Sequence, residues 1–172
     1  MKMFRKSKED LIALKTVYNI PFIVAILSNR GWHALFVYRL SHFFWKIKIP
    51  IISMILTRII HVIYAIDIDF KCKIEGGVII IHGVGLVIGK GVEVKKGTII
   101  YHQVTLGEKG SGVNDGYPQI GNNVILGSGA KLFGDIHIGN NSVVGPNVVL
   151  TRSLEDSKLV KFGFSSYEIK DK

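Results

Sequence analysis

The segment at residues 120–150, IGNNVILGSGAKLFGDIHIGNNSVVGPNVVL, decides the fold because its pattern repeats every six residues. An aliphatic residue opens each repeat, glycine usually follows it, and a small or β-branched residue stands four positions after it. A period of six matches neither the two-residue period of a strand nor the 3.6-residue period of a helix. The pattern predicts a chain that turns a corner every six residues, buries one aliphatic side chain per face, and uses glycine or asparagine where a corner needs a positive φ.

The same period continues upstream in two further phases. The aliphatic residues of the thirteen repeats are Ile68, Ile74, Ile80, Ile88, Val94, Ile100, Leu106, Ile120, Leu126, Leu132, Ile138, Val144 and Leu150. In the last phase the residues four positions later are Val124, Ala130, Ile136, Ser142 and Val148. Three repeats per coil give about four coils of a solenoid. We therefore predict a mainly β chain, with an N-terminal α-helical region at residues 1–65, a parallel β-helix at residues 66–155 and a C-terminal tail at residues 156–172.

Two irregular steps interrupt the repeat. The step from Ile80 to Ile88 is eight residues, and the step from Leu106 to Ile120 is fourteen instead of twelve. Extra residues in a repeat array must leave the coil as loops, and such loops are where binding groups are usually placed. The first irregular step contains His82, and the second is the polar, glycine-rich segment GEKGSGVNDGYPQ at residues 107–119.

The first 65 residues show helical spacing instead. One apolar stripe at steps of three and four runs through Trp32, Phe36, Leu40, Phe43 and Ile47, and Pro50 suits the first position of a following helix. Residues 1–60 hold ten Lys/Arg against two Asp/Glu, a charge of +8, whereas residues 61–172 hold twelve against eleven, a charge of +1. Two interpretations stay open: helices at an anionic membrane face, or helices that pack on each other and on neighbouring subunits.

The compartment follows from simpler features. The single cysteine, Cys72, excludes an internal disulfide, and the first ten residues lack the apolar segment and cleavage site of a signal peptide. Every apolar run is interrupted by Arg, Lys or His before about 18 to 20 residues. We expect a cytoplasmic protein, with peripheral contact to the inner face of the membrane as the open alternative above. The basic charge alone would also suit nucleic acid, but we expect no such partner.

Residues 65–152 resemble the hexapeptide-repeat acyltransferases, and more narrowly serine acetyltransferase and its shorter relatives that acetylate bacterial surface polysaccharides. The motifs that carry the resemblance are VTLG at residues 104–107, the glycine-rich loop that ends at Pro118, and GSGAKLFGDIHIG at residues 127–139. The resemblance implies a left-handed parallel β-helix, a homotrimer with active sites between adjacent subunits, and acetyl-CoA as the acetyl donor.

The resemblance also implies a catalytic pair. Acetyl transfer to a hydroxyl needs a base for the hydroxyl proton, and histidine is the natural base near neutral pH. The histidine at the family's catalytic position is His82, and the aspartate fifteen residues earlier, which would orient the imidazole, is Asp67. Asp69 is two residues away on the same strand face, so the choice between the two carboxylates stays open. His33, His42, His61 and His137 are interpreted as packing or surface residues.

The remaining site residues are also carried over from the family. The acceptor site is expected at His102, Asp115 and Tyr117, and the acetyl-CoA site at Gly107, Ser128, Gly129 and Lys131. Lys109, Lys131 and Lys161 are candidates for the phosphates. No set of His, Cys, Asp and Glu has metal-ligand spacing, so we expect no metal.

The acceptor expectation rests on the loop sequence. Serine acetyltransferases carry an arginine and a histidine where this chain has Gly116 and Tyr117, so the cation that would bind the carboxylate of serine is missing here. We therefore expect an O-acetyltransferase acting on a sugar hydroxyl of a bacterial surface polysaccharide. The alternatives are a serine O-acetyltransferase of cysteine biosynthesis and a non-catalytic β-helix scaffold at the membrane.

Overall fold

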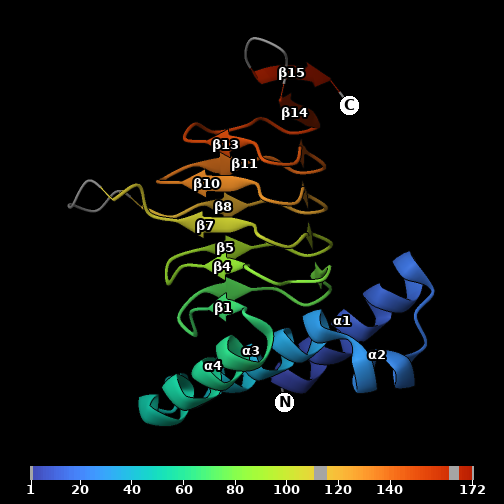
Figure 1. Ribbon diagram of the computed structural model, residues 1–172, viewed down its shortest axis with the longest axis vertical. Coiled ribbons are helices and arrows are strands. Elements are labelled where there is room, and N and C mark those ends of the chain that lie inside the picture. Colours follow the sequence, from blue (N-terminus) through green and yellow to red (C-terminus); the bar gives the residue numbers. More distant parts are fainter. Residues whose placement is uncertain (1, 111–115, 163–166, 172) are drawn as a thin grey trace.

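The chain forms a column of stacked coils on a base of four helices (Figure 1). The computed structural model describes residues 2–110, 116–162 and 167–171. The helices are α1 (Lys2–Tyr18), α2 (Phe22–Ser28), α3 (Arg30–Lys46) and α4 (Pro50–Tyr64). Pro50 occupies the start of α4, as predicted, because a proline there gives up an N–H that has no partner inside the helix.

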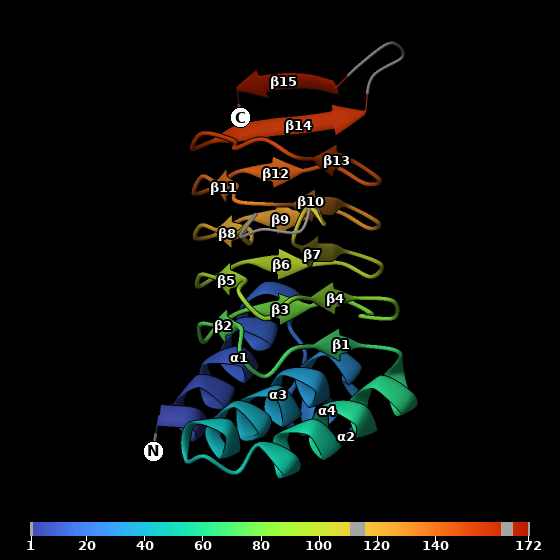
Figure 2. The same cartoon turned by 90° about the vertical axis from the view of Figure 1, so that its left-hand side faces the viewer.

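Short strands build the three faces of the column (Figure 2). The first sheet contains β1 (Asp67–Ile68), β4 (Val87–Ile88), β7 (Thr105–Gly107), β10 (Lys131–Phe133) and β13 (Val149–Leu150). The second contains β2 (Lys73–Ile74), β5 (Glu93–Val94), β8 (Gln119–Ile120) and β11 (His137–Ile138). The third contains β3 (Ile79–Ile80), β6 (Ile99–Ile100), β9 (Ile125–Leu126), β12 (Val143–Val144), β14 (Lys158–Phe162) and β15 (Tyr167–Asp171). Strands pair in parallel, except that β15 is antiparallel to β14.

The interior of the column is the predicted stack of aliphatic side chains. All thirteen repeat aliphatics are buried, and so are the five small or β-branched residues that follow four positions later. The register confirms the stacking: Ile68, Ile88, Leu106, Leu132 and Leu150 lie one above another in the first sheet. Each strand therefore turns one side chain inward and the preceding one outward, so polar residues collect on the outer faces and corners.

Asparagine and glycine supply the positive φ angles at the corners, as predicted, and the glycines that follow the repeat aliphatics have a second role. The positive φ angles in residues 120–150 belong to Asn123, Gly129, Gly134, Asn141 and Asn147, and not to the glycines at positions 121, 127, 139 and 145. Those glycines are needed for close approach, since a Cβ on Gly127 would lie 2.7 Å from the backbone nitrogen of Pro146 in the next coil. Coil stacking, not turn geometry, therefore selects glycine there.

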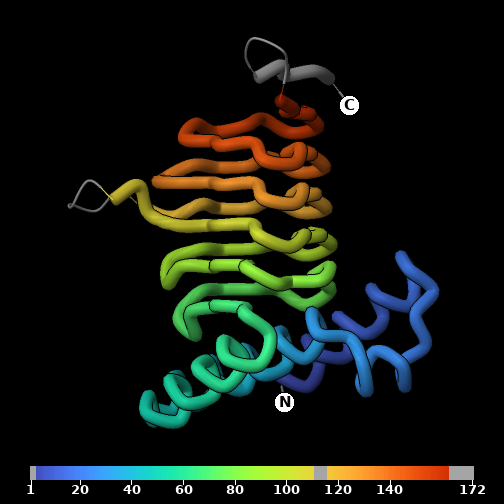
Figure 3. Tube along the Cα trace, in the orientation of Figure 1, coloured from blue at the N-terminus to red at the C-terminus, as the bar shows by residue number. Residues whose placement is uncertain are grey.

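Both irregular steps become excursions at corners. The first is the turn from β3 to β4 that carries His82, and the second is the connection from β7 to β8. Of the second excursion, residues 108–110 and 116–118 are described, and the part leading away from β7 projects from the column (Figure 3).

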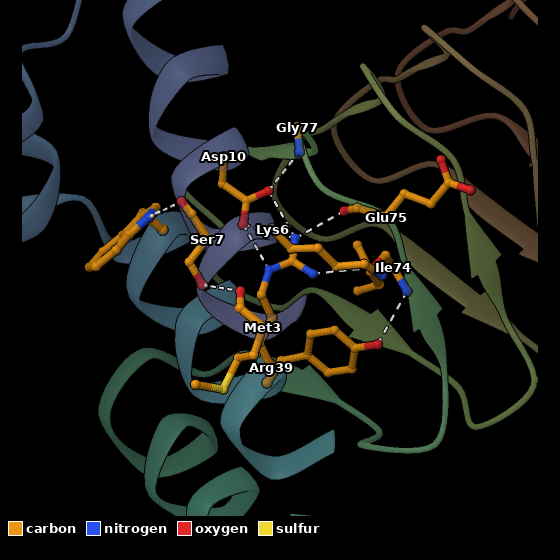
Figure 4. Close-up of polar contacts among 10 residues, drawn as sticks. Met3, Lys6, Ser7, Asp10, Arg39, Ile74, Glu75 and Gly77 are labelled. Atoms are coloured by element: carbon orange, nitrogen blue, oxygen red, sulfur yellow. Dashed lines mark hydrogen bonds and ion pairs between the residues drawn. The ribbon is translucent and has the colours of Figure 1, made fainter. Parts of the chain in front are cut away.

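A buried ion pair joins the helical base to the first coil (Figure 4). Arg39 on α3 donates two hydrogen bonds to Asp10 on α1, at 2.8 and 2.9 Å, and two more to the carbonyls of Ile74 and Glu75. Asp10 also accepts a 2.9 Å bond from the backbone N–H of Gly77. The first coil has no coil beneath it, so these side chains satisfy backbone groups that a neighbouring coil would otherwise bind.

The pair is ionised at neutral pH. Burial raises the pKa of Asp10 to about 6, against the lowering effects of Arg39 and of the Gly77 N–H. A pKa near 6 leaves the carboxylate charged at pH 7, where it can bind the guanidinium in the two-bond geometry that arginine and carboxylate prefer.

Removing the arginine is expected to destabilise the fold strongly. In Arg39→Met the apolar stem is retained but Asp10 is left as a buried charge without its partner, which costs about 3–5 kcal/mol of unfolding free energy. Arg5→Met is the matched control, because Arg5 pairs with Glu9 at the surface, 3.6 Å away, and such pairs contribute about 1 kcal/mol or less. Urea denaturation of both variants at pH 7 makes the comparison; equal losses would contradict the role assigned to Arg39.

Candidate active site

One corner of the column gathers the predicted site residues His82, His102, Ser128 and Gly129. We call the turns at residues 81–86, 101–104, 127–130 and 145–148, which lead from the third sheet to the first, the site corner. Backbone hydrogen bonds stack these turns: Gln103 N–H donates to Val84 (2.9 Å), Gly129 N–H to His102 (3.0 Å) and Asn147 N–H to Ser128 (2.8 Å). Residues far apart in sequence are therefore held in one vertical row.

His82 projects from the lowest turn of this row. Its φ of 62° is left-handed, a conformation that costs energy for a residue with a Cβ, and its side chain is exposed. The turn is fixed by bonds from Gly83 N–H to Ile81 and from Gly85 N–H to Ala65, each 2.7 Å. The two extra residues of the repeat thus produce a strained, well-anchored turn that presents an imidazole to solvent.

His102 lies one coil above His82. The two rings meet edge to face, with centroids 5.9 Å apart and planes at 68°. The Nδ1 atom of His102 is buried and has no hydrogen-bond partner among the described residues. A buried polar atom without a partner is costly, so this nitrogen is suited to a ligand or a water molecule at the corner.

The outward-facing residues of the first sheet form the adjoining wall. The strand register aligns Asp67, Val87, Thr105, Lys131 and Val149 in one column next to the site corner. The ammonium of Lys131 donates a 2.9 Å hydrogen bond to the carbonyl of Gln103, so the lysine bends back over the corner. Asp67 and Lys131 therefore flank the histidines from below and above.

The structure places Asp67 near a different histidine from the one predicted. Among the described residues no hydrogen bond or ion pair joins Asp67 to His82. The Asp67 carboxylate instead faces His61 on α4, with Nδ1 and Oδ2 3.9 Å apart. The Asp69 carboxylate already has a partner within its own turn, since its Oδ1 accepts a 2.7 Å hydrogen bond from the backbone N–H of Lys71. Asp67 remains the better placed carboxylate, and its pairing with His82 stays a prediction.

The predicted donor residues divide into two places. Ser128 and Gly129 lie in the site corner, where Gly129 has a φ of 72°, and Lys131 follows at the start of β10. Gly107 lies at the opposite end of its strand β7, beside Phe133. The first three residues are thus brought together with His102, while Gly107 marks the far edge of the first sheet.

The second excursion folds its described end back onto the chain's own surface. The ring of Tyr117 packs against Gly89 and Gly91, where a Cβ would collide with it, and its hydroxyl donates to Glu108 at 2.9 Å. Partial burial and this hydrogen bond raise the pKa of Tyr117, so its hydroxyl stays neutral. Asp115, the third acceptor residue that we predicted, lies outside the described residues.

Gly116 is held tightly in this region. It has a φ of 64°, and a Cβ at this position would lie 2.5 Å from the Cβ of Asp135. The position therefore has no room for a side chain, and the Asp135 side chain packs against it.

The sequence analysis did not identify three residues that the structure places at the site. Thr105 faces outward beside Lys131, and Gln103, with a φ of 58°, lies under the Lys131 ammonium. Thr105 stands inside VTLG and Gln103 directly precedes it, so the alternation of buried and outward residues could have identified Thr105. His61 could not have been found this way, because its approach to Asp67 depends on where α4 ends. No cluster of His, Cys, Asp or Glu able to hold a metal ion occurs in the described part of the chain.

Comparison with known proteins identifies the family. Residues 117–152 match the bacterial transferase hexapeptide (six repeats) family. The chain is 39% identical over 129 residues to the serine acetyltransferase of Helicobacter pylori, covering 75% of each protein. It is 37% identical over 136 residues to that of Buchnera aphidicola from Schizaphis graminum, covering 77% of this chain and 51% of the relative.

Solved structures agree with this assignment. The serine acetyltransferase of Brucella abortus in complex with coenzyme A superimposes with a TM-score of 0.91 at 26% identity, over 98% of this chain and 67% of that one. The soybean serine acetyltransferase apoenzyme gives 0.91 at 25% identity, over 98% and 69%. The chain therefore belongs to the serine acetyltransferase family of hexapeptide-repeat transferases, and its column is a left-handed parallel β-helix. It spans from about half to three quarters of the length of these curated relatives.

The strained turn makes a stability prediction. Because His82 has a positive φ, His82→Gly should be about 1 kcal/mol more stable to unfolding than His82→Ala, which keeps the Cβ. His137, in the regular strand β11, is the matched control: there the glycine variant should be less stable than the alanine variant by about 0.5–1 kcal/mol. Thermal or urea unfolding of the four variants tests this; the same order at both positions would contradict the strain at His82.

Proposed function

We propose that this chain is an acetyl-CoA-dependent O-acetyltransferase in which His82 is the general base. The observation that carries the proposal is the arrangement of the site corner. There the exposed, strained His82 lies edge to face with His102, and the stacked turns above them lead through Ser128 to Lys131. Membership of the serine acetyltransferase family supplies the donor, since a coenzyme A complex is known for the Brucella relative.

The residues present fit such a donor. The buried, unpartnered Nδ1 of His102 offers a polar contact in the corner, and Lys131 provides a cation a short way along the same row. Acetyl-CoA supplies an acetyl group activated as a thioester. We assign Ser128, Gly129 and Lys131 to holding it along the corner, with Lys131 acting on the phosphates as a point charge.

His82 takes a proton from the acceptor hydroxyl and later gives it to the thiolate sulfur. Its neutral imidazole takes the proton of the acceptor hydroxyl as the hydroxyl oxygen attacks the thioester carbonyl carbon. Backbone N–H groups of the corner stabilise the negative charge that develops on the carbonyl oxygen. When the C–S bond breaks, the imidazolium returns the proton to the sulfur, so the products are an acetyl ester and the coenzyme A thiol. Asp67 is proposed to orient the ring and stabilise the imidazolium, after a small movement away from His61.

One chain supplies only one wall of this site. His82 is exposed, and the described part of the second excursion lies on sheet edges away from the site corner. We propose that the chain is a homotrimer in which the excursion of a neighbouring copy closes the corner, so that each active site lies between two subunits.

Replacing the base should remove catalysis and leave donor binding intact. His82→Ala is expected to lower the rate of coenzyme A release from acetyl-CoA by about a hundredfold or more, because no other base replaces the imidazole. His137→Ala, which removes an exposed histidine from another sheet, should keep its rate. Both variants should retain the thermal stabilisation given by coenzyme A, since ligand binding to the native state raises its stability.

Two outcomes would count against this account in different ways. Near-full turnover by His82→Ala would remove the histidine from the mechanism. No thermal shift in the wild type at millimolar coenzyme A would favour the remaining alternative, a non-catalytic scaffold.

The acceptor has two candidates with different support. The relatives are serine acetyltransferases, which makes the hydroxyl of L-serine the first candidate. The second is a neutral sugar hydroxyl, as in surface-polysaccharide acetylation, and its support is the loop: Gly116 is packed against Asp135 and offers no cation for a carboxylate. Tyr117 offers a neutral hydroxyl and an aromatic face, which suit a sugar.

The loop predicts inefficient use of serine. Each charge-assisted hydrogen bond that the serine carboxylate lacks costs about 1.5–3 kcal/mol, or roughly tenfold or more in kcat/KM. We expect L-serine to be acetylated with kcat/KM at least about tenfold below that of the best neutral hydroxyl acceptor in a panel of nucleotide sugars and oligosaccharide repeat units. Efficient O-acetylserine formation with no use of sugars would overturn the second candidate, and no detectable O-acetylserine would overturn the first.

A further inference from the structure

The outer face of α4 is unusually apolar. Its large exposed apolar side chains are Ile51, Ile52, Met54, Ile55, Ile59, Val62 and Ile63, and Arg58 and His61 are exposed on the same helix. Ile51 and Val62, at the centre of this face, are 69% and 73% exposed. Isolated exposed aliphatic residues are normal, but a continuous apolar helix face marks a contact with another body.

A second exposed apolar surface lies on α2. All its large side chains, Phe22, Ile23, Val24, Ile26 and Leu27, are exposed, and Ala25 is buried against the rest of the base. Figures 1 and 2 both place α2 and α4 at the end of the molecule opposite the last coils of the column. We call the exposed apolar residues of α2 and α4 the basal face.

Exposed cations lie next to the basal face along the chain. Lys48 stands two residues before α4, Arg58 lies on α4, and Arg30 begins α3 directly after α2; Lys46, at the end of α3, is also exposed. Only two acidic residues precede Asp67 in the sequence, and both form ion pairs: Asp10 with the buried Arg39, and Glu9 with Arg5. Asp67 follows α4 and lies 3.9 Å from His61, so it opposes the charge at one edge of α4. The exposed cations of the base still outnumber the carboxylates beside them.

This charge distribution selects the partner. A second copy of the chain packed against the same face would bring the same cations into opposition, which is unfavourable. A bilayer that contains anionic lipids offers both an apolar interior for the isoleucines and negative headgroups for the lysines and arginines. We propose that the basal face is a docking surface for an anionic lipid bilayer.

The docking is peripheral in this proposal. No single helix in the described part of the chain is long and apolar enough to cross a membrane, and one pair, Met3–Tyr18 with Phe22–Ser28, reaches that length and composition only jointly, across a bend of 111°. α4 would lie in the plane of the interface with its apolar face buried among the acyl chains, as amphipathic helices do. The column, with the site corner, would stand away from the lipid.

Vesicle cosedimentation of the full-length chain tests the proposal. We expect binding to phosphatidylcholine vesicles that contain phosphatidylserine, at least tenfold weaker binding to phosphatidylcholine alone, and weakening by salt. Lys48→Glu/Arg58→Glu should weaken binding at least tenfold. Lys96→Glu/Arg152→Glu, which changes the charge equally on the column, should leave it within about twofold.

A second variant tests the apolar half of the surface. Ile51→Ser/Val62→Ser should abolish binding while leaving the thermal unfolding midpoint and the oligomeric state by light scattering unchanged, because both side chains are already exposed in the free chain. Failure of the wild type to bind phosphatidylserine vesicles at low salt would overturn the proposal. A change in oligomeric state for this variant would also overturn it, by showing that the basal face is a contact between copies. Neither result would affect the proposed acetyl transfer.

Discussion

The structure depends on the stacking of one aliphatic side chain every six residues. Successive coils bring these side chains into register, so each buried residue contacts the equivalent residue above and below. Burying a Val, Leu or Ile side chain contributes about 1.5–3 kcal/mol, and the column repeats this gain at every face. Because the interior accepts nothing but these residues and small fillers, every functional group is forced outward, to the faces and corners. The site corner is a direct result of that exclusion.

At each end of the column the outermost coil lacks a neighbouring coil that would bind its backbone groups, and the two ends are covered differently. The last coil is covered by β14 and its antiparallel partner β15. The first coil is covered by helices, where Arg39, Asp10 and Tyr38 bind its otherwise unpaired backbone groups. The Tyr38 hydroxyl both donates to the Cys72 carbonyl and accepts from the Ile74 N–H. Buried polar atoms must be paired, so a charged pair is retained at a place where an apolar residue could not bind the backbone. The same helices present the basal face, so one base both terminates the column and offers a surface to a partner.

Periodicity made the core predictable and left the individual contacts open. The thirteen repeat aliphatics could be named from the sequence because burial alternates with a fixed period, and the two irregular steps correctly marked both excursions. The Arg39–Asp10 pair could not be predicted, since residues 29 positions apart on different helices meet only through tertiary packing. The use of glycine or asparagine at corners with a positive φ was predictable, but the close approach that selects the glycines after the aliphatics was not, because both kinds of glycine look the same in a sequence. His61 and Asp67 meet for a similarly non-periodic reason, and Tyr117 turned out to pack on Gly89 and Gly91 of its own chain.

The central claim is that the site corner binds acetyl-CoA next to His82, and an experimental structure of the oligomer with bound coenzyme A tests it most directly. The account predicts that the pantetheine arm follows the corner along Ser128, Gly129 and Lys131. It also predicts that the thiol ends within hydrogen-bond reach of His82 or His102, at an interface closed by the excursion of a neighbouring subunit. Coenzyme A bound on another face of the column, or a thiol remote from both histidines, would contradict it.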